Sequence, residues 1–211
     1  MARQGAQRVG NDTISDRRLL RGERSRQAVT RHAVDIASLD GLDGLSFGRL
    51  AKDLGLSKAG IQTLFHTKES LQLATVETAQ EVFVDAVIRP ALQAPEGIAR
   101  LRALIERWIA YAAQPLFPGG CFWSANLPEF DSRPGPIRDA LLHQQREWLH
   151  LLARQLERAV AGEHIANIEI DMTVFQINAI LNATNIALRL GDTDSIRNIY
   201  RMIDDLLSPA Q

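Results

Sequence analysis

The fold is decided by one stretch of the sequence, SFGRLAKDLGLSKAGIQTLFHTKESL, which occupies residues 46–71. Apolar residues recur at helical spacing on both sides of Gly55, so the stretch predicts two short helices joined by a sharp turn. Ser46 and Ser57 are of the residue type that caps helix N-termini, and Gly55 can enter the left-handed conformation that ends a helix. The expected product is a helical hairpin with an apolar seam.

The outer face of the second helix is predicted to be small, polar or basic, which suits the close approach of a nucleic-acid groove. The spacing of Ala51, Gly55 and Ile61 is typical of DNA-binding helix-turn-helix units, in which a small residue, a turn glycine and a branched apolar residue hold the helices together. A purely structural hairpin is the alternative, because such hairpins also carry an apolar seam. The outer-face residues are Lys58, Ala59, Gly60, Gln62 and Thr63.

The composition is that of a globular protein. With 211 residues, of which 45% are hydrophobic, the chain can bury the core of one large domain or two small ones. It has no apolar run of the roughly 18 residues that a membrane span requires, and no hydrophobic N-terminal secretory signal. Its single cysteine, Cys121, excludes an intrachain disulfide. We therefore expect a cytoplasmic protein that does not bind a membrane.

The net charge of −1 is unevenly distributed along the chain. Through Lys68 there are 12 Lys and Arg against 7 Asp and Glu, a net charge of +5, and from Glu69 onward there are 12 against 18, a net charge of −6. A basic segment followed by an acidic one is typical of a head that binds a polyanion and a body that does not. A solvated basic tail without a ligand is the alternative.

The remaining sequence predicts an all-α protein. Residues 1–22 contain Arg, Gly, Gln and Ser without apolar periodicity and are expected to form a flexible basic arm. Residues 23–67 are expected to form a three-helix DNA-binding head, and residues 68–211 a helical body. The first body helix, 68–89, is predicted to link the two parts and to stop before a proline. Further body helices are predicted from about Pro95 to Pro115, Pro136 to Ala161, Glu169 to Leu190, and Asp192 to Leu207.

A first helix, a helix-turn-helix and then Phe-x-x-Lys-Glu-x-Leu in residues 65–71 resemble the tetracycline-repressor (TetR) family of transcriptional regulators. The resemblance is close over about residues 23–75 and loose over the rest. Where the family typically ends its recognition segment in Tyr-His-Tyr-Phe, residues 62–65 read Gln-Thr-Leu-Phe, and His66 replaces the usual Pro or Gly. The resemblance implies a DNA-binding head and a helical body for ligand binding and dimerisation.

Within the hairpin, the resemblance implies two kinds of DNA contact. Lys58, Gln62 and Thr63 are expected to meet base edges or nearby phosphates, whereas Ser46, Arg49, Lys52 and Lys68 are expected to hold the DNA backbone. The whole predicted DNA-binding set is Ser46, Arg49, Lys52, Ser57, Lys58, Ala59, Gly60, Gln62, Thr63 and Lys68.

In the family, two C-terminal helices from each subunit form a four-helix dimer interface. The penultimate helix of this chain carries alanines at four-residue intervals beside asparagines, a pattern that allows close helix–helix approach. Packing within one chain is the alternative. The candidate interface residues are Ala179, Asn182, Ala183, Ile186, Ala187, Ile196, Ile199 and Ile203.

Family members also bind small-molecule effectors between the body helices, and such pockets are apolar with a few polar anchors. Several of the body's aromatic residues flank the loop before Cys121, and Asn126 and Asn178 are candidate anchors. For each aromatic residue, a place in the ordinary core is the alternative. The candidate pocket residues are Trp108, Tyr111, Phe117, Cys121, Phe122, Trp123, Asn126, Trp148, Phe175 and Asn178.

Catalytic motifs are missing from the sequence, which has no Gly-rich phosphate loop, no His-Glu-x-x-His and no paired cysteines. His143, Glu147 and His150 share a helix face without zinc-site spacing, so we interpret them as a solvated polar stripe. Cys121 is interpreted as a small apolar residue rather than a redox-sensitive thiol. We therefore expect no enzymatic activity, no metal and no cofactor.

These observations predict a homodimeric regulator of transcription that binds double-stranded DNA, a repressor released from a palindromic operator by a small-molecule effector. One alternative is a DNA-binding activator or architectural factor without small-molecule control. The other is an all-helical enzyme in which the hairpin is only structural. The first alternative predicts that no compound changes DNA binding, and the second predicts no duplex binding even at low salt.

Overall fold

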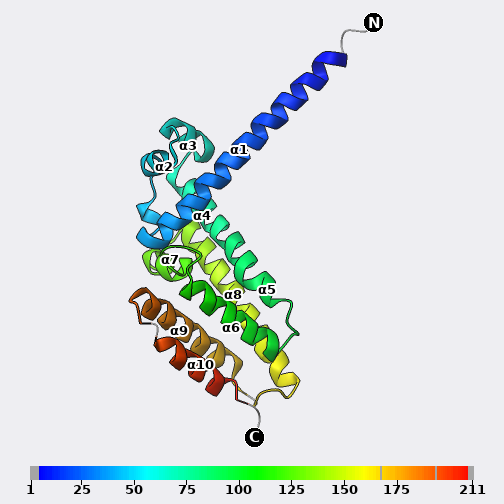
Figure 1. Ribbon diagram of the computed structural model, residues 1–211, viewed down its shortest axis with the longest axis vertical. Helices are drawn as coiled ribbons and strands as arrows, with labels where there is room; N and C mark the ends of the chain where they lie inside the picture. Colours follow the sequence, from blue (N-terminus) through cyan, green and yellow to red (C-terminus); the bar gives the residue numbers. More distant parts are fainter. Residues whose placement is uncertain (1–4, 167, 193, 209–211) are drawn as a thin grey trace.

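The computed structural model describes residues 5–166, 168–192 and 194–208, with side chains from residue 22 onward except that of Ser195. Every regular element in this part of the chain is a helix. The helices form a small head at one end of an elongated body (Figure 1). The predicted all-α class, with an N-terminal helix-turn-helix head and a helical body, is thereby confirmed.

Helix α1 (Gly5–Asp40) runs from the N-terminal arm into the head. Its C-terminal half is packed, with Val29, Ala33 and Ala37 fully buried, whereas its N-terminal half projects away from the molecule (Figure 1). Residues 5–22 of the predicted arm are thus helical, and residues 1–4 lie outside the described residues. A helix without a packed face is only marginally stable in water, so the flexibility of the arm stays a prediction.

The linking helix continues through a proline. Pro90 has no N–H, and in a regular α-helix its ring would clash with the carbonyl group four residues earlier. Here the preceding turn is π-helical and wider, and the N–H of Arg89 bonds to the carbonyl oxygen of Val84, five residues earlier. The helix therefore passes the predicted end at residue 89, because the π-helical turn accommodates the proline. The three parts of the linking helix are α4 (Lys68–Phe83), η2 (Val84–Ile88) and α5 (Arg89–Ala91).

Head and body are joined by two sets of packing contacts, since α1 packs against both α4 and α7. In the body, α8 packs against α4, α6, α7 and α9, and it begins at Pro136 as predicted. Helix α10 packs against α9, and the two lie along one side of the body (Figure 1). The remaining head elements are η1 (Leu42–Gly44), α2 (Phe47–Leu54) and α3 (Lys58–Phe65), and the body helices are α6 (Ile98–Ala113), α7 (Phe122–Phe130), α8 (Pro136–Ala161), α9 (Ile170–Arg189) and α10 (Ser195–Leu206).

Within the described ranges, no helix combines the length and the apolar character needed to cross a bilayer. Among the same residues, no three His, Cys, Asp or Glu side chains come together in a group suited to a metal ion. The side chains of His143 and Glu147 lie 3.6 Å apart on the exposed surface of α8, at ordinary helical spacing.

Candidate functional site

The turn of the helix-turn-helix is set by local hydrogen bonds. The hydroxyl oxygen of Ser46 accepts a hydrogen bond from the backbone N–H of Arg49 at 3.1 Å and so caps α2. Helix α2 ends at Gly55, which adopts the left-handed conformation with φ of 63° and ψ of 28°. Ser57 caps α3 in the same way, accepting a hydrogen bond from the N–H of Gly60 at 3.0 Å. The ends of α2 and α3 that face the turn are therefore set by short-range interactions.

Helix α3 has one buried face and one exposed face. Ile61 and Phe65 point inward and are 0% and 1% exposed. From α1, the Arg26 guanidinium donates a hydrogen bond to the carbonyl oxygen of Leu64 at 2.8 Å and lies 4.5 Å from the centroid of the Phe65 ring. These contacts fix the orientation of α3 in the head. The opposite face is exposed and consists of Lys58, Ala59, Gly60, Gln62 and Thr63.

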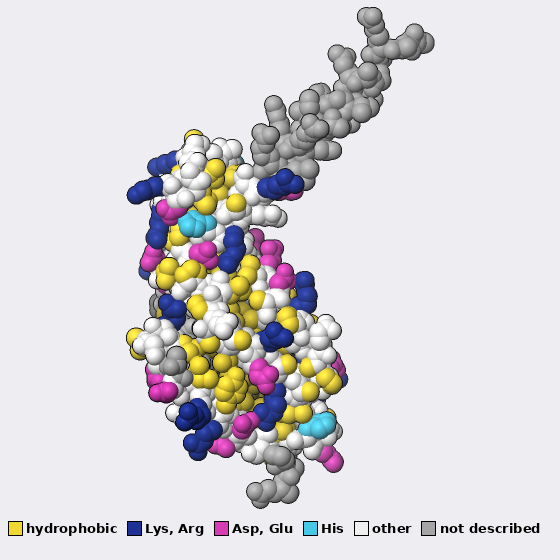
Figure 2. All heavy atoms as spheres, in the orientation of Figure 1, with side chains coloured by type: hydrophobic (Ala, Val, Ile, Leu, Met, Phe, Trp, Pro, Cys, Tyr) yellow, Lys and Arg dark blue, Asp and Glu magenta, His cyan; other side chains and the backbone are white. Residues whose placement is uncertain are grey.

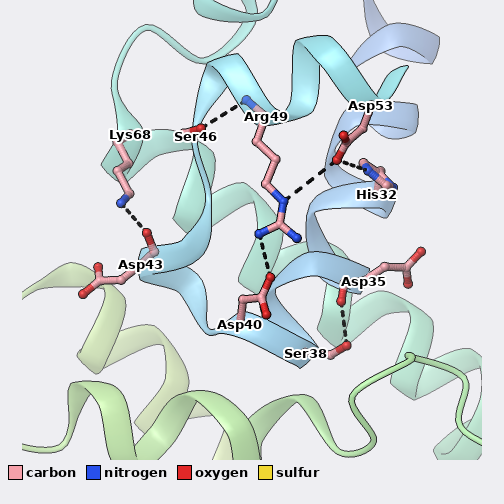
Figure 3. Close-up of polar contacts among 9 residues, drawn as sticks. All are labelled: His32, Asp35, Ser38, Asp40, Asp43, Ser46, Arg49, Asp53 and Lys68. Atoms are coloured by element: carbon pink, nitrogen blue, oxygen red, sulfur yellow. Dashed lines mark hydrogen bonds and ion pairs between the residues drawn. The ribbon is translucent and has the colours of Figure 1, made fainter. Parts of the chain in front are cut away.

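The predicted DNA-binding cations differ in their partners within the head. The Arg49 guanidinium lies 2.6 Å from a carboxylate oxygen of Asp40, and the ammonium group of Lys68 donates to the carbonyl oxygen of Asp43 at 2.7 Å (Figure 3). Lys52 and Lys58 are exposed, and neither has a partner among the described residues. Their charges are therefore available to an anion outside the chain.

Helix α7 of the body holds η1, the turn between α1 and α2 of the head. The backbone N–H of Leu42 donates to Asn126 Oδ1 at 2.8 Å and to Glu129 Oε2 at 2.9 Å, and the N–H of Asp43 donates to Glu129 Oε1 at 3.1 Å. On the other side of the turn, Gln72 Nε2 of α4 donates to the Leu42 carbonyl oxygen at 2.9 Å. The orientation of the head thus depends on α4 and α7 together.

The carboxylate of Asp43 adds an ion pair to this junction. Arg133, which follows α7, donates a hydrogen bond to it. This bond, with the positive charges of Arg133 and Lys68, lowers the pKa of Asp43 below its ordinary value despite the opposing effect of burial. Asp43 therefore stays ionised and keeps its partner at neutral pH.

A cavity of about 310 Å³ lies in the body between the linking helix and α6, α7, α8 and α9. The linking helix contributes Gln80, Phe83, Val84 and Ile88 to the lining, the last two from its π-helical turn. Ligand and head would consequently share one structural element. The cavity is lined by Gln80, Phe83, Val84, Ile88, Leu92, Trp108, Cys121, Trp123, Ser124, Gln144, Gln145, Glu147, Trp148, Leu151, Arg154, Asn178, Leu181 and Asn182.

The predicted pocket residues divide into three groups. All three tryptophans of the chain, Trp108, Trp123 and Trp148, line the cavity together with Cys121 and Asn178. Phe175 lies on the outer side of α9 and is 68% exposed. Tyr111, Phe117, Phe122 and Asn126 are buried but do not line the cavity.

Aromatic rings pack edge to face around the cavity. The Phe83 ring centroid lies 5.1 Å from that of Trp123, 5.6 Å from that of Trp148 and 5.3 Å from that of Tyr111. Behind this layer, the Tyr111 hydroxyl accepts a hydrogen bond from the N–H of Phe122 at 3.0 Å. Burial raises the pKa of Tyr111 well above its ordinary value, and the neighbouring Cys121 thiol acts in the same direction. Tyr111, which packs against the lining residue Phe83, therefore stays uncharged at neutral pH.

Amide side chains form the polar part of the cavity. Gln145 Nε2 donates to Asn178 Oδ1 at 3.1 Å, and the hydroxyl of Ser124 donates to Asn182 Oδ1 at 2.8 Å. The indole N–H of Trp123 donates to Gln144 Oε1 at 3.1 Å. These bonds connect α7, α8 and α9 across the cavity.

An exposed apolar stripe follows one side of α9, and we refer to it as the α9 stripe. Its members recur at intervals of three or four residues, which places them on one helix face. Hydrophobic side chains gather over the region where Figure 1 places α9 and α10, as Figure 2 shows. An apolar face of this kind on a water-soluble helix is typical of an association surface. The α9 stripe consists of Met172, Phe175, Ala179, Ala183, Ile186 and Leu190.

Residues 97–203 match the family model described as the tetracyclin repressor-like C-terminal domain, which is half of the chain. The chain belongs to the TetR family. The resemblance seen in the head therefore extends through the body, and the predicted family is confirmed. The chain matches no curated protein sequence.

Solved structures of other proteins, among them two TetR-family regulators, share this fold. A regulator from Chloroflexus aurantiacus J-10-FL has 21% sequence identity and a TM-score of 0.79, with 86% of this chain and 93% of the other covered. One from Agrobacterium tumefaciens has 16% identity and a TM-score of 0.76, covering 88% and 98%. AibR, in complex with isovaleryl coenzyme A and operator DNA, has 17% identity and a TM-score of 0.68, covering 88% and 99%. At these identities the likeness concerns the fold.

In this TetR-family regulator the predicted dimer residues have different environments. Ala179, Ala183 and Ile186 belong to the exposed α9 stripe. Asn182 lines the cavity, and Ala187 and Ile196 are half-buried. Ile199 and Ile203 are 6% and 3% exposed in a single chain. Other apolar side chains of α9 and α10 are exposed but were not predicted to lie at the interface. They are Met172, Leu190, Tyr200 and Met202, together with Phe175, which was predicted to line the pocket.

Other cavity-lining residues that were not predicted from the sequence come from the linking helix. Gln80, Phe83, Val84 and Ile88 line the cavity, whereas the sequence analysis assigned this helix only a connecting role. Their spacing of three and four residues was the signal available in the sequence, because it places them on one face of the helix.

Proposed function

We propose that this TetR-family regulator is a homodimeric repressor that binds a palindromic DNA operator and leaves it when a small molecule occupies the body cavity. The observation that carries the proposal is the shared linking helix, which opens beside the head at Lys68 and lines the cavity from Gln80 to Leu92. In the related fold of AibR, operator DNA and an acyl-coenzyme A are both bound.

The DNA-binding part of the proposal rests on the two faces of α3. Its inner face is locked by Ile61 and Phe65, and its outer face is free of large apolar side chains. Lys58, Gln62 and Thr63 would meet base edges or nearby phosphates in the major groove. The DNA backbone would be held by Ser46, Arg49, Lys52 and Lys68, with Ser57, Ala59 and Gly60 allowing close approach.

Dimerisation is proposed through the α9 stripe and the exposed side of α10. Two copies related by a twofold axis would each contribute the same apolar surface. This pairing would set two heads at the half-site spacing of successive major-groove faces, about 34–36 Å or somewhat more.

The effector part of the proposal follows from linkage. A ligand changes DNA affinity only if it binds the DNA-bound and released conformations unequally. A compound that contacts Phe83, Val84 and Ile88 touches the linking helix itself, and the other end of that helix positions the head. Such a compound would favour the linking-helix orientation that fits the cavity rather than the operator.

The proposal is tested first by selecting bound duplexes from a random pool with the purified full chain. Lys58→Ala should then weaken binding to all sequences, and the slope of log K against log salt should fall by about 0.9 for each phosphate that the variant no longer neutralises, about 2 per dimer. Arg107→Ala is the matched control, because Arg107 is exposed on the body helix α6. An unchanged affinity and salt slope for Lys58→Ala would refute its placement on DNA.

The effector part is tested by adding compounds to the selected complex in a gel-shift assay and to the free protein in a thermal-shift assay. A compound that raises Tm and also releases DNA supports a ligand-responsive repressor. If every compound that raises Tm leaves operator affinity unchanged, the protein binds DNA without small-molecule control.

A further inference from the structure

We infer that the effector of this protein is an uncharged, planar aromatic compound that carries one group able both to donate and to accept a hydrogen bond. The inference rests on the proposed function, in that it takes the body cavity as the effector site. It adds the chemical class of the ligand, which follows from the charges, rings and amides that line the cavity.

The first argument is charge. Of the lining side chains only Glu147 and Arg154 are ionisable with a charge at neutral pH, and both are exposed on α8. The other lining side chains are apolar, aromatic, amide, hydroxyl or thiol groups. An ionised ligand seated among these uncharged groups, away from the two exposed side chains, would lose its hydration without gaining a counter-ion. The lining therefore selects against anions and cations and favours a neutral molecule.

The second argument is the aromatic content of the walls. Phe83, Trp108, Trp123 and Trp148 come from four different helices and all line the same space. They are between 4% and 8% exposed, so their positions are fixed by packing. Aromatic pairs prefer offset or edge-to-face geometry, and a planar ring can meet several of these side chains in that way at once. A saturated ligand of equal size gains the apolar contact but not this geometry.

The third argument is the hydrogen-bonding capacity that the protein leaves unused. The side-chain amides of Gln144 and Asn182 each donate and accept within the chain, to and from other cavity residues or the backbone. Gln145 and Asn178 bond to each other through one N–H and one oxygen, and neither the Gln145 oxygen nor the Asn178 N–H₂ has a further partner among the described residues. One acceptor and one donor thus remain together at the α8–α9 side, and the Gln80 amide on the linking helix is a further group without a side-chain partner among the described residues.

The fourth argument is size. A cavity of about 310 Å³ lies at the low end of the range of about 300–1,000 Å³ that small-molecule sites occupy. A coenzyme A thioester, the ligand class of AibR, carries several phosphate charges, whereas Arg154 is the only cation in the described lining. The two related folds are therefore expected to recognise different ligands.

The test uses titration calorimetry on the full-length protein with four probes. 1-Naphthamide is neutral, planar and able to donate and accept, and 1-naphthoate is its anionic isostere. Decahydronaphthalene-1-carboxamide has the same polar group on a saturated frame, and isovaleryl coenzyme A represents the acyl-coenzyme A class. We expect 1-naphthamide to bind at least about tenfold more tightly than each of the others, because it alone satisfies charge, ring and amide complementarity. Equal or tighter binding of 1-naphthoate or isovaleryl coenzyme A, or no binding of 1-naphthamide, would overturn the inference.

Variants locate the probe in the cavity. Asn178→Leu should weaken 1-naphthamide binding by about tenfold while leaving naphthalene, which has no polar group, unaffected. Trp148→Leu should weaken both compounds. Gln93→Leu, at an exposed position outside the lining, is the matched control and should change neither. Equal loss of both compounds in Asn178→Leu would show that the amide plays no part in recognition and would refute that part of the inference.

The same samples separate this inference from the proposed function. Tight binding of 1-naphthoate that also releases the selected operator would overturn the ligand class and support ligand-responsive repression. Tight binding of 1-naphthamide with no change in operator affinity for any bound compound would support the ligand class and overturn ligand-responsive repression.

Discussion

Asn126 Oδ1, on α7, accepts a hydrogen bond from the backbone N–H of Leu42 at 2.8 Å, although the two residues lie 84 positions apart in the sequence. The Asn126 side chain is fully buried, and its Nδ2 donates to the carbonyl oxygens of Ala37 at 3.2 Å and Phe122 at 2.8 Å. The same short helix lines the cavity with Trp123 and Ser124. One end of α7 therefore lines the body cavity and the other holds the head.

Asn126→Leu should destabilise the protein, because it removes the side-chain hydrogen bonds to residues 37 and 42 on either side of the α1–η1 junction. The two side chains have nearly the same volume, so packing should change little. Leu42 N–H keeps Glu129 as an acceptor, so the expected loss is about 1–3 kcal/mol rather than the cost of a wholly unpaired group. At about 2–4 °C per kcal/mol for a chain of this size, Tm should fall by several degrees. The exposed substitution Gln93→Leu serves as control, and an equal Tm for both variants would contradict the role of Asn126.

Arg133→Gln should raise the pKa of Asp43 toward the ordinary value of about 3.9. In the folded protein the hydrogen bond from Arg133 lowers this pKa. A lowered carboxyl pKa contributes stability above the unfolded value, and that stability is lost as the pH falls below about 4 through the folded pKa. Titration of the Asp43 carboxyl resonance by NMR measures the shift. The steepening of acid unfolding below about pH 4 should be smaller in the variant, and an unchanged Asp43 pKa would show that the ion pair is not formed in solution.

The parts of the fold that were predictable from the sequence are those set by local interactions. Ser46, Gly55 and Ser57 act within a few residues of their own positions, so their caps and turn follow from residue type. Pro136 begins α8 for the same reason. Pro90 was misleading, because the rule that it ends a helix assumes α-helical bonding, and a π-helical turn releases that constraint.

The parts of the site that were not predictable depend on distant contacts. The amide of Asn126 is a group that could anchor a ligand, but in the structure its oxygen accepts from the backbone N–H of residue 42 and its nitrogen donates to the backbone carbonyl of residue 37. Phe175 is an aromatic residue of the type that lines pockets. Helix α9 has two apolar faces, however, and the helical period of the sequence does not show which of them packs against the body. The neighbouring Val174 and Ile177 are buried and leave Phe175 on the outside. Residue type therefore identified the chemistry, and tertiary packing decided its location.

Gly119→Ala should destabilise the loop that joins α6 to α7. A Cβ atom at this position would lie 1.7 Å from the carbonyl oxygen of Ser38, and the Gly119 N–H donates to the Ser38 hydroxyl at 2.9 Å. Loop and helix must separate to admit the methyl group, and such overpacking costs about 1–3 kcal/mol. The control is Gly22→Ala on α1, where no atom lies within 4 Å of the added carbon and helix propensity predicts a gain of up to about 1 kcal/mol. Urea unfolding distinguishes the two, and a stable Gly119→Ala would contradict the close approach.

Tyr111 should keep its proton at a pH at which a free tyrosine, with a pKa of about 10, is ionised. Burial raises its pKa, so the folded state favours the neutral phenol, and the stability this provides is lost as the pH rises above about 10. Absorbance at alkaline pH should show late ionisation that coincides with unfolding. Burial and the charge of Glu106 also raise the pKa of Tyr200, but that of Tyr111 is raised further. Tyr111→Phe should therefore remove the later part of the signal and, by leaving the Phe122 N–H without its acceptor, cost about 1–3 kcal/mol. Tyr200→Phe should retain the part of the signal that coincides with unfolding, and the loss of that part in this variant would show that it comes from Tyr200 rather than from Tyr111.

Phe175→Glu should convert the protein to a monomer and abolish operator binding while leaving the fold intact. Phe175 is 68% exposed in the single chain and lies in the α9 stripe, so a charge there costs little in the monomer. In a twofold interface the substitution occurs twice. Each copy loses the roughly 1.5–3 kcal/mol that burial of a large apolar side chain provides, and each must also bury the charge of the new glutamate. Light scattering gives the oligomeric state, circular dichroism the fold, and a gel shift on the selected duplex the DNA affinity. Gln176→Glu introduces the same charge at an adjacent exposed position without removing an apolar group and should have the smaller effect. A Phe175→Glu variant that remains dimeric would place the subunit contact away from the α9 stripe, and a monomer with full operator affinity would separate DNA binding from dimerisation.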